Sequence, residues 1–310
     1  MSSAEPVRPV SAVGALPPAL DAGLLAVALV GLSTSGPLIA AAAAPPLAIA
    51  FWRNGLASAV LLPFSLVRRR AEFRAMPGRS WRLSALSGVL LAAHFGLWIP
   101  SLSLTSVASS TALVAVQPVW AAIFARLAGQ RVPRTVWLGI GVAVTGAALL
   151  AGVDLDVSAR ALAGDLLALA GGALAAAYVS VGSTVRAGTT ATAYTCICYS
   201  TCAALLLAAC LIGRQHLAGY DAGTWAKIVG LTVGAQLLGH SLVNLVLRSA
   251  SATVVSLAIL FEVPGASLIA ALWLHQVPGP SSAAGLGVLL VGTAVVIVTS
   301  VRLARPDPAV

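Results

Sequence analysis

Glu262 is the only acidic residue that falls in the middle of one of the long apolar stretches of this sequence. A carboxyl group surrounded by apolar groups tends to be protonated, and ionisable side chains within a membrane commonly mark solute or proton pathways. Glu262 is therefore a candidate to carry a coupling proton or to pair with an amine of a bound solute. The alternative is a structural ion pair with Arg53 or His240. Arg53 could also extend outward to water.

A second candidate group is spread over two apolar stretches. Gln236, His240 and Asn244 are spaced i, i+4 and i+8, which aligns them on one face of a helix. These side chains either join neighbouring helices by hydrogen bonds, worth about 0.6 kcal/mol each, or line a cavity for a solute. His94 and Trp98 are spaced i and i+4, so an imidazole beside an indole could bind an aromatic or carboxylated compound. Hydrogen bonding of the imidazole to a neighbouring hydroxyl group is the alternative.

Gln117, Trp120 and Tyr178 complete the candidate cavity residues. Gln117 falls near the middle of its apolar stretch, and the two aromatic residues are candidate cavity walls. Pro118 and Pro264 each remove a backbone hydrogen-bond donor, so both are predicted to kink their helices and to act as hinges. No residue is predicted to be catalytic, and no cofactor is expected. The cysteines share one apolar stretch and match neither a disulfide nor a zinc pattern, so no metal site is predicted. They are Cys196, Cys198, Cys202 and Cys210.

The elements that must position these side chains are apolar helices. The chain has 310 residues, of which 59% are hydrophobic and 9% are charged, and its mean hydropathy is +0.98. Soluble domains have about 25% charged residues and disordered chains are far less hydrophobic, so the composition predicts an all-α integral membrane protein. The short connections leave no room for a soluble catalytic or nucleic-acid-binding domain. With about 20 apolar residues per crossing, ten spans are predicted, at 19–40, 46–67, 83–103, 105–126, 134–152, 161–182, 190–212, 225–247, 251–273 and 281–302.

The basic residues are distributed unequally between the two ends of these spans. With the N-terminus inside, fourteen arginines fall on the inner side and three basic residues on the outer side, as the positive-inside rule describes. The net charge of +9 is therefore interpreted as a topology signal rather than as a nucleic-acid-binding surface. The prediction is a multi-pass protein of a bacterial inner membrane with cytoplasmic tails at 1–18 and 303–310. The inner arginines are Arg8, Arg68, Arg69, Arg70, Arg74, Arg79, Arg82, Arg126, Arg131, Arg134, Arg186, Arg248, Arg302 and Arg305, and the outer basic residues are Arg160, Arg214 and Lys227.

The sequence contains an internal repeat. An offset of 146 residues superposes the fourth and fifth spans on the ninth and tenth, and an offset of 142 relates residues 24–26 to residues 166–168. Since each repeat has five spans, an odd number, the second copy must cross the membrane in the opposite direction. Two inverted five-helix repeats are predicted, at 19–152 and 161–302, and solute sites in such proteins lie near the midplane between the repeats. The offset of 146 matches Pro118 with Pro264, Gln130 with Gln276, and Gly139, Gly141 and Gly146 with Gly285, Gly287 and Gly292, where glycines would permit close helix packing.

This arrangement resembles the drug/metabolite transporter superfamily, and in particular its EamA-type ten-helix exporters. Residues 110–146 and 256–292 carry the resemblance, because each has a proline inside a helix, a polar helix end and a glycine-spaced final helix. Residues 164–169 also resemble the family's opening of the second repeat. The resemblance implies that the third, fourth, eighth and ninth spans, together with the first and sixth, surround a central cavity.

The sequence departs from the family's pattern at two places. Gln130 and Gln276 stand where the family often has a glutamate at a helix end. In the ninth span one residue separates Glu262 from Pro264, where the family frequently has the two residue types adjacent.

The resemblance implies a secondary transporter that exports small organic metabolites across the lipid bilayer by alternating access. Trp98, Trp120 and Tyr178 favour amino acids with aromatic or large apolar side chains as substrates; drugs, cationic compounds and nucleoside-like compounds are the alternative. No Walker-type loop is present, so ATP is not the predicted energy source, whereas proton coupling through Glu262 is a candidate. An intramembrane serine protease using Ser267, and a channel or scramblase, are alternatives from other classes. The oligomeric state is left open.

Overall fold

The computed structural model describes residues 18–68, 70–186, 188–239, 242 and 259–304. These residues form α-helices, one π-helix and short connections, with no strand among them. The helices are α1 (Pro18–Ser33), α2 (Ser35–Ala41), α3 (Pro46–Arg68), α4 (Arg70–Ala75), α5 (Gly78–Ser101), α6 (Val107–Val114), α7 (Gln117–Leu127), α8 (Arg134–Val157), α9 (Ala159–Arg186), α10 (Ala191–Ile212), α11 (Ala222–Leu231), the π-helix η1 (Thr232–Gly239), α14 (Glu262–Leu274) and α15 (Pro280–Ala304).

Seven helical stretches among the described residues are long and apolar enough to cross a membrane, judged by length and composition. They fall in the first four predicted spans and in the sixth, seventh and tenth. Two shorter apolar helices, Arg134–Leu149 and Glu262–Leu274, lie in the fifth and ninth, and α11 with η1 lies in the eighth. The prediction of an all-helical membrane protein is therefore confirmed, and each of the ten predicted spans contains helix.

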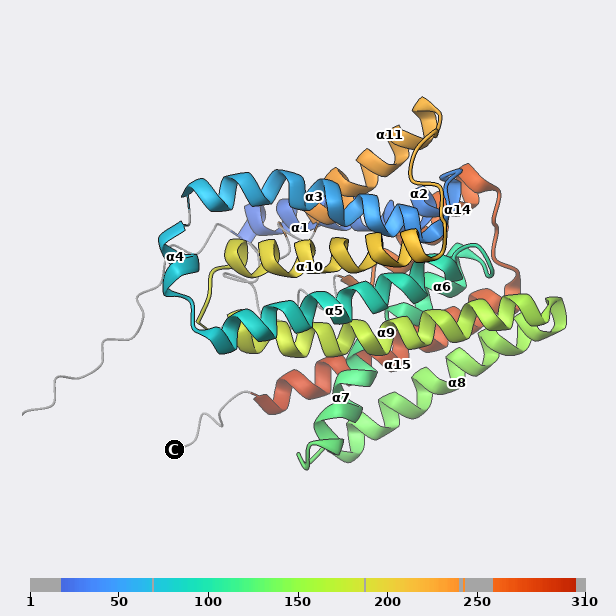
Figure 1. Cartoon of the computed structure of the whole chain (residues 1–310). Helices are drawn as coiled ribbons and strands as arrows, with labels where there is room; N and C mark the ends of the chain where they lie inside the picture. Colours follow the sequence, from blue (N-terminus) through green and yellow to red (C-terminus); the bar gives the residue numbers. More distant parts are fainter. Residues whose placement is uncertain (1–17, 69, 187, 240–241, 243–258, 305–310) are drawn as a thin grey trace, which may run out of the picture.

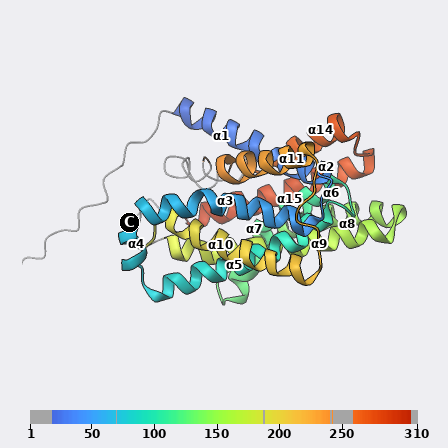
Figure 2. The same cartoon turned by 45° about the horizontal axis from the view of Figure 1, so that its top comes forward.

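Most of the helices run side by side along one direction, whereas the short α4 lies across one end of the bundle (Figure 1). α1 begins and α15 ends at that same end. At the opposite end, α2 contacts both α11 and α14 (Figures 1 and 2). The first described helix therefore begins, and the last one ends, at the same end of the bundle.

The packing of the helices follows the repeat. α5 packs along α9, which joins the third span to the sixth, and η1 packs along α1, which joins the eighth to the first. α6 contacts α9 in the same way that α14 contacts α1. Three further contacts join a span to its own repeat partner, namely α3 with α10, α6 with α14 and α8 with α15. If each span is replaced by the matching span of the other repeat, the same set of contacts is obtained, as expected for two copies of one unit.

Glycines allow a close contact between α8 and α15. A Cβ atom on Gly146 would meet the backbone nitrogen of Leu289, and one on Gly292 would meet the backbone nitrogen of Ala143. Gly141, by contrast, faces open space. Only some of the repeated glycines therefore serve close helix packing, and those that do bring two backbones together with no side chain between them.

Three of the predicted spans are interrupted. The first changes from α1 to α2 at Thr34, whose Oγ1 donates to the carbonyl oxygen of Gly31 over 2.6 Å. The fourth is divided between α6 and α7 just before Pro118, and α14 begins at Glu262, two residues before Pro264. Because proline has no N–H and its ring collides with a carbonyl of the preceding turn, the helix stops ahead of each proline, where the sequence predicted a kink.

Gln276 joins the two repeats at the end of the bundle opposite α4. Its Oε1 accepts a hydrogen bond of 3.0 Å from the backbone N–H of Val107, the first residue of α6. The first N–H groups of a helix have no partner within the helix, so this amide satisfies one of them. The repeat partner of Gln276, Gln130, is exposed.

Candidate functional site

Arg53 lies inside the bundle on α3, with only 2% of its surface exposed. Its Nε donates to Oε1 of Gln236, its Nη1 donates to Oγ of Ser35 over 3.4 Å, and its Cζ lies 4.3 Å from the centre of the Phe95 ring. An isolated charge in apolar surroundings is strongly unfavourable. The amide, the hydroxyl and the ring face compensate for this. The alternative in which Arg53 extends outward to water is therefore wrong.

Gln236 connects Arg53 to a second amide. Its Nε2 donates to Oδ1 of Asn54 over 3.1 Å, and Nδ2 of Asn54 donates to the carbonyl oxygen of Ala50 over 2.9 Å. Each amide uses its oxygen and its nitrogen toward different partners, which fixes the orientation of both side chains. Gln236 is among the residues predicted from the sequence, whereas Asn54 is not. The sequence feature that could have identified Asn54 as a site residue is its position directly after Arg53 within an apolar stretch.

Gln236 belongs to the π-helix η1. Such helices are rare and occur frequently at functional sites, because the wider turn displaces side chains from their regular positions. The irregular turn lies where η1 passes close to α1, since a Cβ atom on Gly31 would be 2.7 Å from the carbonyl oxygen of Gly234. The irregularity therefore coincides with a contact between the two repeats and with the amide that binds Arg53.

His94 and Trp98 lie together, as their spacing predicts. Both are buried, and their rings stack with centres 5.6 Å apart and planes inclined by 12°. Nδ1 of His94 lies 2.9 Å from the carbonyl oxygen of Gly171 on α9. Since a carbonyl oxygen only accepts, Nδ1 carries the proton and Nε2 of the neutral ring is left as an acceptor. The partner of the imidazole is thus a backbone carbonyl rather than a hydroxyl group.

The same sequence offset links the two central polar residues of the site. The 142 residues that separate the matched segments of the first and sixth spans also separate His94 from Gln236. His94 bonds from the third span to the sixth, and Gln236 lies on the eighth span where it packs against the first. The two repeats therefore place a polar side chain at equivalent positions, although the residue types differ.

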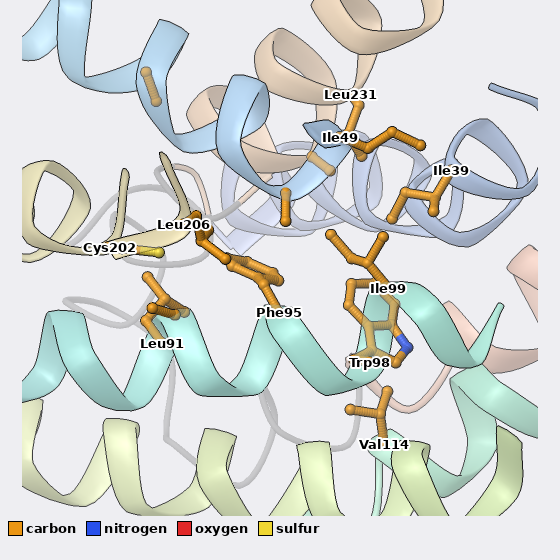
Figure 3. Close-up of a cluster of buried hydrophobic side chains, with 14 of the residues drawn as sticks. Ile39, Ile49, Leu91, Phe95, Trp98, Ile99, Val114, Cys202, Leu206 and Leu231 are labelled. Atoms are coloured by element: carbon orange, nitrogen blue, oxygen red, sulfur yellow. The ribbon is translucent and has the colours of Figure 1, made fainter. Parts of the chain in front are cut away.

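An apolar cluster surrounds Trp98 and Phe95 (Figure 3). Both side chains come from α5, and the cluster continues through Val114 of α6 and Leu206 of α10. Within it, Nε1 of Trp98 is buried and has no hydrogen-bond partner among the described residues. Because buried indole N–H groups usually find an acceptor, this group is available to an acceptor on a bound molecule.

Glu262 is the first residue of α14 and is half-buried. Among the described residues, Arg53 makes its hydrogen bonds to Gln236 and Ser35 rather than to a carboxylate. The predicted partner His240 lies outside the described residues, as does Asn244.

The remaining predicted residues divide between two apolar clusters. Tyr178, on α9, packs against the cluster that contains Trp98. Trp120, on α7, packs instead against the cluster between α6, α8 and α15, with its ring centre 6.3 Å from that of Phe124. Gln117 is the first residue of α7 and half-buried. The structure therefore brings together His94, Trp98 and Tyr178 and joins Gln236 to them through Arg53 and Phe95, whereas Trp120 packs in the other cluster.

A separate shallow groove lies on the surface of α8 and α15. It has a volume of about 370 Å³ and a mainly apolar lining. None of the predicted site residues contributes to it. The lining residues are Trp137, Leu138, Gly141, Val142, Thr145 and Val288.

Apolar helices of membrane-spanning length, packed around a buried cation and amide network, define a multi-pass integral membrane protein. The model of the EamA-like transporter family matches residues 19–152 and again residues 162–298. The chain therefore belongs to the EamA-like transporter family, within the drug/metabolite transporter superfamily, and is a transporter of small molecules rather than an enzyme.

Comparison with solved structures supports the fold. A structure titled "Crystal structure of protein" aligns with a TM-score of 0.63 and 19% identity, over 94% of this chain and 100% of the other. At that identity the similarity concerns the fold alone. No curated protein matches the sequence.

Proposed function

We propose that this transporter exports amino acids, preferentially those with aromatic or large apolar side chains, by alternating access between the two sides of the membrane. The observation that carries the proposal is the buried guanidinium of Arg53, which the described residues meet with neutral hydrogen-bond acceptors and a ring face. Guanidinium groups bind carboxylates in bidentate pairs. An α-carboxylate is thus the ligand that this cation favours.

The groups around Arg53 match the rest of an amino acid. Glu262, the only acidic residue in the middle of a predicted span, would pair with the α-amine. The rings of Phe95 and Trp98 offer an apolar surface for a side chain, and the free N–H of Trp98 offers a donor to the carboxylate. A cation without a carboxylate, by contrast, would meet the positive charge of Arg53. This disfavours the alternative of cationic drugs.

The test is a counterflow screen in proteoliposomes with amino acids, nucleosides and cationic drugs. We expect saturable flux, stimulated by exchange, for aromatic and large apolar amino acids. Arg53→Gln should weaken their apparent affinity at least tenfold, because a hydrogen bond to a charged group is worth about 1.5–3 kcal/mol. Arg53→Lys should retain part of the affinity, and Arg126→Gln, at an exposed position on α7, should change nothing.

Several results would reject this function. Flux restricted to nucleosides or cationic drugs would exclude amino acids as the substrate class. Flux that does not saturate and ignores exchange would indicate a channel. If Arg53→Gln does not yield folded protein, Arg53→Lys and a stabilised Arg53→Ala variant can be measured instead. Amino-acid affinity equal to wild type in both variants would show that Arg53 does not bind the substrate.

The membrane and the orientation belong to the same proposal. We infer that the protein lies in a bacterial inner membrane with the arginine-rich end of the bundle in the cytoplasm, because positive residues remain on that side. We also infer that the chain consists of two repeats, at 19–152 and 161–302. Both chain ends would then be cytoplasmic. Reporter fusions at residues 18 and 304 should both report the cytoplasm, and opposite locations of the two would refute the orientation.

A further inference from the structure

α4 and the adjoining ends of α3 and α5 carry five exposed arginines, which we call the arginine surface. On α4, two of them are spaced i and i+4, and on α5 two are spaced i and i+3, so each pair shares one helical face. The only acidic residue among them is Glu72. The arginine surface consists of Arg68, Arg70, Arg74, Arg79 and Arg82.

Aromatic rings hold the two parts of the arginine surface together. The ring centres of Phe73 on α4 and Trp81 on α5 are 5.8 Å apart, and Nε1 of Trp81 donates to the carbonyl oxygen of Phe73 over 3.4 Å. Next to them, Met76 and Leu83 pack against the apolar cluster of the bundle. Trp81 is itself 41% exposed, which is typical of tryptophan at the level of lipid headgroups.

Glu72 attaches α4 to the start of α10. Its Oε1 accepts a hydrogen bond of 2.9 Å from the backbone N–H of Thr190, and Oγ1 of Thr190 accepts one of 3.3 Å from the N–H of Ala193 in the first turn of α10. α10 in turn packs along α3, which carries Arg53. A contact made at α4 is therefore connected, through one carboxylate, to a helix beside the candidate site.

We propose that the arginine surface binds the phosphate headgroups of anionic phospholipids, and that this contact stabilises the helix bundle through Glu72. Topology alone requires only an excess of positive charge. Here the arginines stand in pairs on helices fixed by an aromatic contact, α4 lies across the end of the bundle (Figure 1), and Trp81 lies beside them. Guanidinium groups bind phosphate in a bidentate manner, and short helices with apolar and basic sides lie at the headgroup level.

The test measures thermal unfolding of the purified chain in detergent micelles with added dioleoylphosphatidylglycerol or dioleoylphosphatidylcholine. We expect the anionic lipid alone to raise the unfolding temperature, with an effect that falls as salt is added. The triple variant Arg70→Gln, Arg74→Gln, Arg79→Gln should shift the lipid titration to higher concentration, by about fivefold for each arginine removed. The matched control removes Arg126 on α7, Arg131 on the connection between α7 and α8, and Arg134 at the start of α8, and should respond as wild type.

Further measurements distinguish lipid phosphate from free phosphate and test whether Glu72 transmits the stabilising effect to the bundle. Inorganic phosphate at the same concentration should not raise the unfolding temperature. Glu72→Ala should retain phosphatidylglycerol during purification, measured as bound phosphorus, but lose most of the temperature shift. If the triple variant does not fold, Arg74→Gln alone should shift the titration about fivefold.

Three outcomes would overturn the inference: an equal response to both lipids, an equal loss in the control triple variant, or full reproduction of the shift by inorganic phosphate. None of these measurements involves a transported solute. The lipid inference can therefore fail while the proposed export function stands, and the reverse also holds.

Discussion

Arg53 carries a charge that the chain must accommodate at every physiological pH, because a guanidinium group does not lose its proton in proteins. Gln236 supplies the acceptor for Nε, and Asn54 holds the amide of Gln236 in the required orientation. The three side chains come from two helices that are far apart in the sequence, α3 and η1. Gln236 thus stabilises the fold, and it also sets the orientation of the Arg53 guanidinium that a solute would meet.

Gln236→Leu is expected to destabilise the protein by about 1.5–3 kcal/mol, because it leaves a charged donor without its acceptor. Gln236→Glu should lose less stability than Gln236→Leu, since a carboxylate also accepts from Nε of Arg53 although it cannot donate to Asn54. Unfolding in detergent, followed by tryptophan fluorescence, measures both. Gln130→Leu, at the exposed repeat position, serves as the control, and a Gln236→Leu variant as stable as wild type would contradict the expected role.

Trp98→Phe is expected to raise the apparent KM for transported amino acids about tenfold, the loss of one neutral hydrogen bond of roughly 1.4 kcal/mol. The reason is that Nε1 of Trp98 has no partner among the described residues. The smaller ring should also lower the stability of the fold, because it leaves a void in the apolar cluster. Trp81→Phe is the control at the bundle surface. An unchanged KM would show that the indole N–H does not contact the solute.

The burial of the Arg53 side chain could not be predicted from the sequence. Its main partner, Gln236, is 183 positions away, and only the packed bundle brings the two side chains together. The spacing of His94 and Trp98, in contrast, lies within one helical turn, so their stacking follows from local geometry.

At the scale of helices, the positions of the spans follow from the lengths of the apolar stretches, and the breaks before Pro118 and Pro264 follow from the chemistry of proline. The π-helix η1 does not follow from its own stretch of sequence, and it lies where the chain packs closely against α1 at Gly31, a distant residue. The separation of Trp120 from Trp98 likewise depends on which neighbours α7 packs against.

Gly146→Ala is expected to destabilise the protein by about 1–3 kcal/mol, because the added methyl group meets the backbone of Leu289 in a packed interface. Gly141→Ala, on the same helix but facing open space, should be neutral or stabilising by up to about 1 kcal/mol, since alanine favours helix over glycine. Thermal unfolding of the two variants in the same detergent makes the comparison. Equal behaviour of the two would mean that α8 and α15 are not in close contact.

At the scale of the whole molecule, Glu262 at the start of α14 and Arg53 on α3 place an ionisable acid and a cation in opposite halves of the chain. If Glu262 carries the coupling proton, Glu262→Gln should abolish uptake driven by a pH gradient but preserve exchange of solute for solute. Proteoliposome uptake with and without an imposed gradient measures this, with Asp221→Asn, at an exposed site, as the control. Wild-type flux that ignores both the pH gradient and the membrane potential would exclude coupling.

The backbone contact between α8 and α15 limits how the two halves of the molecule can rearrange. One helix from each half meets the other with no side chain between them, and such a tightly packed seam resists sliding. If transport follows the proposed alternating access, tilting about this seam is the movement that remains. A tilt that widens one mouth of the bundle would then narrow the other, so that the joint between α8 and α15 would couple the opening of one side to the closing of the other.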